Sequence, residues 1–237
     1  FNEFNTPKIG MYATNILQQI GFKIENPPYT CCGRSLISKG FLKEAKKQAQ
    51  KLVTLLLPYA KDGKQIVGLE PSCILTIADE YPELLNTDDA KLVAKACITI
   101  DDLLAKEIDE GRFDLQFYVN KMDVLMHAHC HQKALTGTDS TLKVLNALPG
   151  VTASEVDSGC CGMAGSFGYE KEHYDFSMAI GEKRLFPAIR KADVSTEIIS
   201  NGTSCRCQIS HGARRNPQHL VEFINARLQN TIGSTII

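Results

Sequence analysis

The chain has 237 residues, with 26 basic and 27 acidic side chains and a formal charge of −1, which gives no reason to expect nucleic acid as a partner. Its length allows one large domain or two small ones. Apolar runs such as 52–57 are far too short to cross a bilayer, and no secretory signal is evident. Nine cysteines in an ordinary composition predict a reduced, cytoplasmic protein that uses some thiols as ligands. The chain opens at Phe1 without a methionine, so we expect a piece of a longer polypeptide.

Short apolar runs alternate with longer amphipathic ones along the whole chain. The helix predicted over 90–108 has the period of 3.6 residues, and Thr87-Asp88-Asp89 before it is a capping signal. Alternation of this kind predicts an α/β fold with largely parallel strands. In chain order the pattern predicts helix 9–20, strand 22–25, helix 41–57, strand 65–69, helix 90–108, strand 123–127, helix 142–148, strand 152–156, helix 170–186, strand 197–200 and helix 218–228.

The cysteines indicate an internal repeat. Two doublets followed by glycine, Cys31-Cys32-Gly33 and Cys160-Cys161-Gly162, lie 129 residues apart, and each precedes a further thiol, Cys73 or Cys205. We therefore predict two tandem α/β units with short, largely parallel sheets, over residues 1–115 and 116–237.

The thiols follow the predicted strands. Cys31, Cys73, Cys130, Cys160 and Cys205 each come shortly after a strand ends. Ligands of open parallel sheets collect at the carboxyl ends of the strands. The cysteines are therefore expected to converge, which suggests a metal ion or an iron–sulfur cluster.

The second unit has the fuller set of candidate ligands, Cys130, Cys160, Cys161 and Cys205. Four thiolates suit an iron–sulfur cluster or a closed zinc site. Adjacent cysteines diverge, so a larger cluster or two metal centres could use both. Glycines at 159, 162, 165 and 168 would let the backbone approach a bulky group. The alternative is that the doublet is buried apolar filler.

The first unit offers three cofactor-binding candidates, Cys31, Cys32 and Cys73. Cys130 precedes the second doublet by thirty positions, and the equivalent position of the first unit is Phe1, which is no thiol. A structural role for these three cysteines and a role as ligands are equally supported.

Other polar residues near the thiols are weaker candidates. Alternation along the strand end would place His127, His129 and His131 on one face, opposite Cys130, where imidazole and thiolate would suit zinc. We favour the view that one histidine donates to the cluster or the backbone and that the others pack or face solvent, because thiols already complete the ligand count. Cys207 is expected to be a bystander and Cys97 to be helix core, and no role is expected for His173, His211 and His219. Arg34, Lys133 and Arg206 are expected to be solvated at the surface, and the alternative is that they offset thiolate charge or steer an anionic group.

Four segments resemble the cysteine-rich "CCG" domain that occurs in heterodisulfide reductase and in the iron–sulfur subunits of glycolate oxidase and anaerobic glycerol-3-phosphate dehydrogenase. They are similar above all to the C-terminal part of fused FAD-linked oxidases of D-lactate and related D-2-hydroxy acids, and the resemblance covers the chain as two tandem copies. The segments are Asp157–Gly168, Leu69-Glu70-Pro71-Ser72-Cys73, His129-Cys130-His131-Gln132-Lys133 and Ser204-Cys205-Arg206.

The resemblance implies an electron-transfer domain that relays electrons from a flavin to an acceptor such as a quinone. Cys130, Cys160, Cys161 and Cys205 would hold one [4Fe-4S] cluster, with Cys31, Cys32 and Cys73 as remnants or partial ligands. The family's closing Cys-x-x-Cys pair is replaced by Cys205-Arg206-Cys207 and a lone Cys73. No catalytic residue and no flavin-binding segment is predicted here, so FAD is expected on another part of the parent protein.

Two other functions stay open at this point. One is a zinc-binding structural or docking module, and the other is a thiol-redox domain like heterodisulfide reductase. The expected location is the cytoplasm, with peripheral attachment at the inner membrane as a second option.

Overall fold

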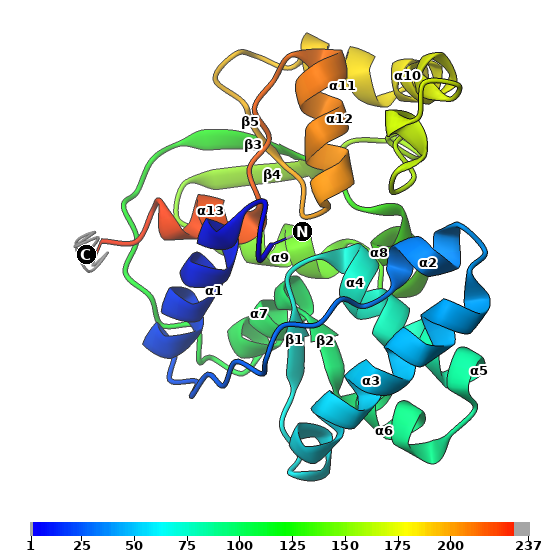
Figure 1. Cartoon of the computed structure of the whole chain (residues 1–237). Helices are drawn as coiled ribbons and strands as arrows, with labels where there is room; N and C mark the ends of the chain where they lie inside the picture. The colour runs from blue at the N-terminus through cyan, green and yellow to red at the C-terminus, as the bar shows by residue number, and fades with distance from the viewer. Residues whose placement is uncertain (1, 230–237) are drawn as a thin grey trace.

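A computed structural model describes residues 2–229 of the chain (Figure 1). Its helices and strands alternate along the chain, as an α/β fold requires. The elements are α1 (Pro7–Gln19), α2 (Arg34–Ser38), α3 (Leu42–Lys61), β1 (Ile66–Gly68), α4 (Pro71–Leu75), a π-helical turn (Thr76–Glu80), α5 (Tyr81–Leu85), α6 (Asp88–Ala96), β2 (Cys97–Thr99), α7 (Ile100–Asp109), β3 (Met122–Met126), α8 (Cys130–Leu135), α9 (Asp139–Asn146), β4 (Val151–Glu155), a 3₁₀ turn (Phe167–Tyr169), α10 (Tyr174–Lys183), α11 (Leu185–Lys191), β5 (Glu197–Ile199), α12 (Thr203–Ala213) and α13 (Leu220–Asn225).

The described strands form two small parallel sheets. β1 pairs with β2, with Ile66 opposite Cys97, and the second sheet has the order β4-β3-β5. Gln218, which follows α12, forms one isolated parallel bridge with Ile199 of β5. The predicted α/β class with short parallel sheets is therefore confirmed, as are the strands expected near β1, β3, β4 and β5.

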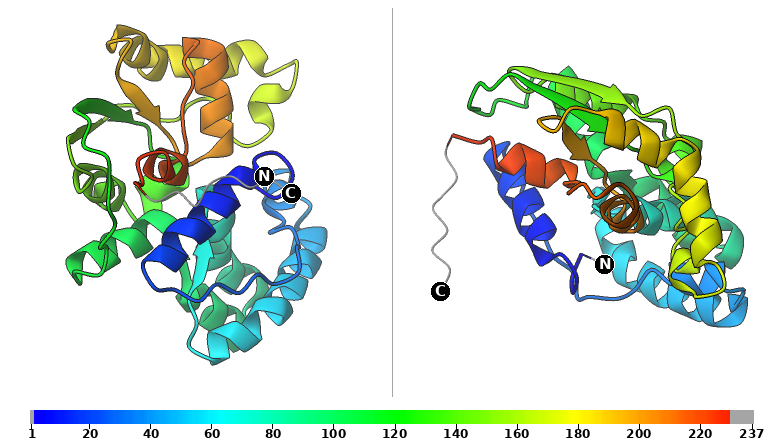
Figure 2. Two further views of the ribbon diagram at one scale, coloured as in Figure 1. Left: turned by 90° about the vertical axis from the view of Figure 1, so that its left-hand side faces the viewer. Right: turned by 90° about the horizontal axis from the view of Figure 1, so that it is seen from above.

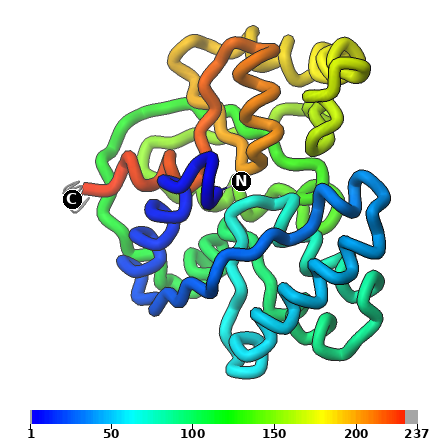
Figure 3. Tube along the Cα trace, in the orientation of Figure 1, coloured from blue at the N-terminus to red at the C-terminus, as the bar shows by residue number. Residues whose placement is uncertain are grey.

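The strand predicted over 22–25 is wrong. Residues 22–33 form no regular structure and run as one extended segment between α1 and α2 (Figure 3). Phe22 and Ile24 are half-buried while Lys23 and Glu25 are exposed, so the alternation of a strand is present. A strand also needs a neighbour for its backbone hydrogen bonds, and no described strand pairs with this segment.

The helix predicted over 90–108 is interrupted. α6 ends at Ala96, the chain becomes extended at Cys97–Thr99 to pair with β1, and Thr99 then caps α7 by accepting from Asp102 N at 3.2 Å. Thr99 is also 2% exposed, whereas Cys97 and Ile98 are half-buried. Cys97, expected in helical core, instead sits on β2. The helix predicted over 170–186 begins only at Tyr174 and is broken at Arg184.

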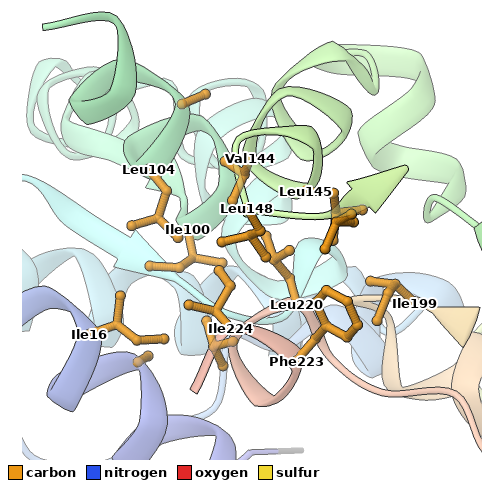
Figure 4. Close-up of a cluster of buried hydrophobic side chains, with 14 of the residues drawn as sticks. Ile16, Ile100, Leu104, Val144, Leu145, Leu148, Ile199, Leu220, Phe223 and Ile224 are labelled. Carbon is orange, nitrogen blue, oxygen red and sulfur yellow. The ribbon is translucent and has the colours of Figure 1, made fainter. Parts of the chain in front are cut away.

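The largest buried cluster joins helices from both halves of the chain. α1 packs against α13, and α7 packs against α9; both views of Figure 2 show α1 beside α13. Figure 4 shows Ile16 of α1, Ile100 of α7, Leu145 of α9 and Phe223 of α13 in one apolar group. Val124 and Met126 of β3 and Ile199 of β5 belong to the same cluster, so these helices pack against the second sheet.

No helix within residues 2–229 is long and apolar enough to span a membrane.

Candidate metal centre

The carboxyl ends of β3, β4 and β5 carry the thiols of the second unit. Cys130 is the first residue of α8 after β3, and Cys205 lies in the first turn of α12 after β5. Cys160 and Cys161 occupy the loop after β4. Because the three strands are parallel, their carboxyl ends meet at one edge of the sheet.

The four thiols form a continuous line of contacts. Cys130 contacts Cys160, and Cys161 contacts both Cys160 and Cys205. Cys161 and Cys205 are only 2% and 1% exposed, whereas Cys130 and Cys160 are half-buried. The line therefore runs from the interior toward the surface.

The ionisation of these thiols is uneven. Contact with Cys130 lowers the pKa of Cys160 to about 2, and contact with Cys161 lowers the pKa of Cys205. The same contacts, together with burial, raise the pKa of Cys130 and of Cys161. Neighbouring thiols in a buried site cannot all become thiolates unless a cation balances their charge. The donor set is therefore one that a metal ion or cluster would complete.

His127 is the residue that our sequence reasoning undervalued. It is fully buried, and a ligand atom of its ring lies with the sulfurs of Cys161 and Cys205 in a group whose members are within 4.8 Å of one another. Its Nδ1 is 2.8 Å from Ser158 Oγ, while its Nε2 has no hydrogen-bond partner. An orphaned buried nitrogen beside two thiols fits a metal-binding role.

The predicted arrangement of the three histidines is wrong because the strand ends before them. His129 caps α8, with Nδ1 accepting from His131 N at 3.2 Å. Burial lowers the pKa of His131, which lies near Arg34. Of the three histidines, only His127 has a ring nitrogen grouped with the sulfurs of Cys161 and Cys205. A signal for this role was available, since His127 directly follows the buried strand β3.

The three basic residues near the thiols make different contacts. Lys133 lies close enough to Cys130 to favour its thiolate, and its Nζ donates to Ser158 O at 2.7 Å. Arg206 is buried and donates to the carbonyls of Ser200 and Asn201, which precede α12. Arg34 forms an ion pair with Glu80.

Cys207 and His219 were both expected to have small parts or none. Cys207 lies beside Tyr169 and outside the line of four thiols. His219, for which no role was expected, is fully buried and caps α13. Its Nε2 donates to Leu69 O at 2.8 Å while Nδ1 accepts from Val221 N. His219 therefore joins α13 to the end of β1.

The thiols of the first unit also meet. Cys32 contacts both Cys31 and Cys73 and is 7% exposed, whereas Cys31 is exposed. The contact with Cys31 lowers the pKa of Cys32, but the contact with Cys73 and burial outweigh it and raise the value to about 12. Both doublets share one local turn, in which Gly33 N donates to Cys31 Sγ at 3.4 Å and Gly162 N donates to Cys160 Sγ at 3.2 Å.

Gly162 is required by the packing of the second doublet. Its φ is +96°, and a Cβ added there would lie 2.1 Å from the carbonyl oxygen of Ser177 on α10. We expect Gly162→Ala to lower the free energy of unfolding by at least about 2 kcal/mol, from left-handed strain and the backbone clash. Denaturant unfolding measures this.

Gly159, on the other side of the doublet, is the matched control. A Cβ added there meets nothing within 4 Å. Gly159→Ala should change the free energy of unfolding by no more than about 0.5 kcal/mol. Equal losses for the two variants would contradict the role given to Gly162.

Fold and site together define a thiol-rich α/β domain in which cysteine side chains and one buried histidine gather at one sheet edge. The family model described as "Cysteine-rich domain" (CCG) matches residues 1–78 and 124–210. The chain belongs to this family.

Three relatives show where such domains occur. The chain is 29% identical over 226 residues to a subunit of the anaerobic glycerol-3-phosphate dehydrogenase of Escherichia coli (strain K12), covering 94% of this chain and 56% of that protein. It is 26% identical to "D-2-hydroxyglutarate dehydrogenase" of Pantoea ananatis, covering 94% of this chain and 22% of that protein. It is 25% identical to "Lactate utilization protein A" of Oceanobacillus iheyensis, covering 95% of this chain and 93% of that protein. The chain thus spans about half or less of the two dehydrogenase relatives.

Proposed function

We propose that this chain is the iron–sulfur electron-transfer domain of an FAD-linked dehydrogenase of 2-hydroxy acids such as D-lactate or glycolate. The observation that carries the proposal is the line of Cys130, Cys160, Cys161 and Cys205 at one sheet edge, since four thiols match the ligand set of a [4Fe-4S] cluster. Such a cluster, when bound, accepts and releases single electrons.

The protein's own residues would hold and tune this group. Cys161 and Cys205 bind from the interior, where they are 2% and 1% exposed, and Cys130 and Cys160 bind from the half-buried side. The Gly162 N–H donates to Cys160 Sγ, and such hydrogen bonds to sulfur influence reduction potential. Lys133 offsets part of the thiolate charge near Cys130.

A zinc site is the second candidate, and His127 is the observation that favours it. One imidazole nitrogen and the sulfurs of Cys161 and Cys205 lie within 4.8 Å of one another, and mixed nitrogen and sulfur ligands are usual for zinc. Zinc would make the domain a structural or docking module without an electron-transfer role.

Metal analysis of protein purified without oxygen tests these alternatives. We expect about four iron and four sulfide per chain, a brown colour and an electron paramagnetic resonance signal on reduction. Stoichiometric zinc without iron, in colourless protein that survives air, would contradict the electron-transfer proposal and support a zinc-binding structural module. Metal-free protein in which Cys160 and Cys161 cycle with disulfide substrates would favour a thiol-redox domain.

The parent enzyme is part of the same proposal. A flavin-binding domain or subunit would supply electrons, and a quinone would be a suitable acceptor. On this view the chain alone does not oxidise a hydroxy acid. It acts in the cytoplasm, with the acceptor reached at the inner face of the membrane. The relatives named as dehydrogenases or dehydrogenase subunits support this context. The division into units 1–115 and 116–237 is likewise our proposal, supported by the two separate matches to one family.

A further inference from the structure

The outer face of α3 is rich in lysine. Residues 39–51 contain five lysines and one glutamate, whereas the whole chain has 26 basic and 27 acidic side chains. Lys43, Lys46, Lys47 and Lys51 are all exposed, and their spacing by three and four residues places them together on one side of the helix. Positive charge is thus concentrated on one short stretch of an otherwise balanced chain.

The fold does not use these charges for its own ion pairs. The ion pairs within residues 2–229 include none of the four lysines, whereas Lys39, which follows α2, pairs with Glu170. Glu44, the one acidic residue of the stretch, is exposed as well. The lysines therefore create a local positive potential that attracts an anionic partner.

Two large apolar side chains lie beside the lysines. Phe41, at the N-cap of α3, is 57% exposed, and Leu42, the first residue of the helix, is 54% exposed. Leu42 precedes Lys46 by four residues, so it lies one turn ahead of that lysine on the same side of the helix. The opposite side of α3 is packed into the protein through Ala45, Ala49, Leu52, Val53 and Leu56. Attachment of the helix therefore does not require Phe41 or Leu42.

The turn between α2 and α3 fixes the backbone at Phe41. Gly40 has a φ of +76°, its N–H donates to Ile37 O at 3.0 Å, and Phe41 N donates to Leu36 O at 2.9 Å. This is a Schellman motif, in which the residue after the glycine frequently packs against the end of the preceding helix. Phe41 stays more than half exposed instead, so the turn presents an aromatic side chain to the surroundings.

The same helix is joined to the first thiol set. Gln48 Nε2 donates to Cys31 O at 2.6 Å, and a Cβ added at Gly33 would lie 3.2 Å from Gln48 Cγ. Cys31 itself is exposed. A partner that binds the lysines of α3 is therefore close to the doublet Cys31-Cys32.

We propose that the basic face of α3, made by Phe41, Leu42, Lys43, Lys46, Lys47 and Lys51, binds the surface of an anionic lipid bilayer. The lysines are attracted to anionic headgroups, and Phe41 and Leu42 enter the boundary between headgroups and acyl chains. Charge complementarity selects an anionic partner, and the two exposed apolar side chains favour lipid over an acidic protein surface. The inference deepens the proposed function and rests on it for its purpose, because an acceptor such as a quinone is reached in a membrane.

Co-sedimentation of the full chain with lipid vesicles tests this proposal. We expect the chain to sediment with vesicles of phosphatidylglycerol and phosphatidylcholine in equal parts, and to stay in solution with vesicles of phosphatidylcholine alone. Lys46→Glu combined with Lys47→Glu should weaken binding at least about tenfold, since two attractive charges become repulsive. Phe41→Ser combined with Leu42→Ser should also weaken it at least about tenfold, through lost apolar burial. All four side chains are exposed, so circular dichroism should show an unchanged fold.

Lys183→Glu combined with Lys191→Glu is the matched control. These two lysines are exposed at the ends of α10 and α11, far from α3 in Figure 1, and the two substitutions change the net charge of the chain by the same amount. This variant should bind the anionic vesicles as the unaltered chain does. Metal-free and metal-loaded protein should bind equally, which separates this test from the test of the proposed function.

Four results would overturn the proposal. Failure to sediment with the anionic vesicles would do so, and would leave an acidic protein surface as the partner that the lysines fit. Full binding by the variant at Lys46 and Lys47, or an equal loss in the control variant, would show that the basic face is not the site. Full binding by the variant at Phe41 and Leu42 would show that charge alone accounts for the attraction.

Discussion

Cys205→Ser is expected to reduce bound metal by at least about tenfold in protein that remains folded, because it removes the most buried sulfur of the set. Cys205 is 1% exposed, contacts Cys161, and lies with His127 in the compact group of ligand atoms. Serine is close to cysteine in size, so the packing of α12 should survive. Metal per chain after anaerobic purification, with circular dichroism as the check on folding, measures the effect.

Cys97→Ser is the matched control for this experiment. Cys97 is also a partly buried free thiol, but its sulfur donates to Val93 O and lies outside the line of four thiols. The Cys97 variant should retain its full metal content. Equal loss from both variants, or full retention in the Cys205 variant, would contradict the assignment of the site.

Glu70→Ala is expected to lower the free energy of unfolding by about 2–4 kcal/mol, because Glu70 joins α4 to α12, two of the helices that carry thiols. It is 5% exposed and caps α4, which carries Cys73, by accepting from Ser72 N at 3.4 Å. The same oxygen accepts from Ser72 Oγ at 2.8 Å. Its other oxygen accepts from Thr203 N at 2.9 Å and Thr203 Oγ1 at 2.8 Å at the start of α12. Alanine leaves these buried donors without a partner. Urea unfolding gives the size of the loss.

Glu70→Gln separates hydrogen bonding from mere volume. A glutamine oxygen can still accept from Thr203, and its amide can donate to Ser72 Oγ, so at least half of the lost free energy should return. Faster amide exchange at Thr203 in the alanine variant alone would show that the first turn of α12 has loosened. A glutamine variant as unstable as the alanine variant would count against the capping role.

The strands that position the thiols could be predicted because their signals are local. β3, β4 and β5 are short apolar runs, and each is followed by a cysteine, so the meeting of Cys130, Cys160, Cys161 and Cys205 follows from parallel pairing alone. By contrast, the chain at 97–99 continues the helical period of its neighbours. Only pairing with β1 makes it extended, and that is a tertiary contact.

The role of His127 could not be read from spacing for a similar reason. Strand alternation groups it with His129 and His131, but the strand ends at Met126 and the chain turns into α8. The hydrogen bond to Ser158, which comes from the loop after β4, then orients the ring. Which nitrogen is left free is decided by a residue that is distant in sequence.

The exchange of helices between the two halves has a consequence for how such a chain could have arisen. α13 of the second half covers α1 of the first, and α7 of the first half covers α9 of the second. A half-length ancestor would have exposed the apolar face of its last helix. Such a half-length chain could bury that face against another copy of itself, so the contacts made here within one chain are those that an intertwined homodimer of half-length chains would make.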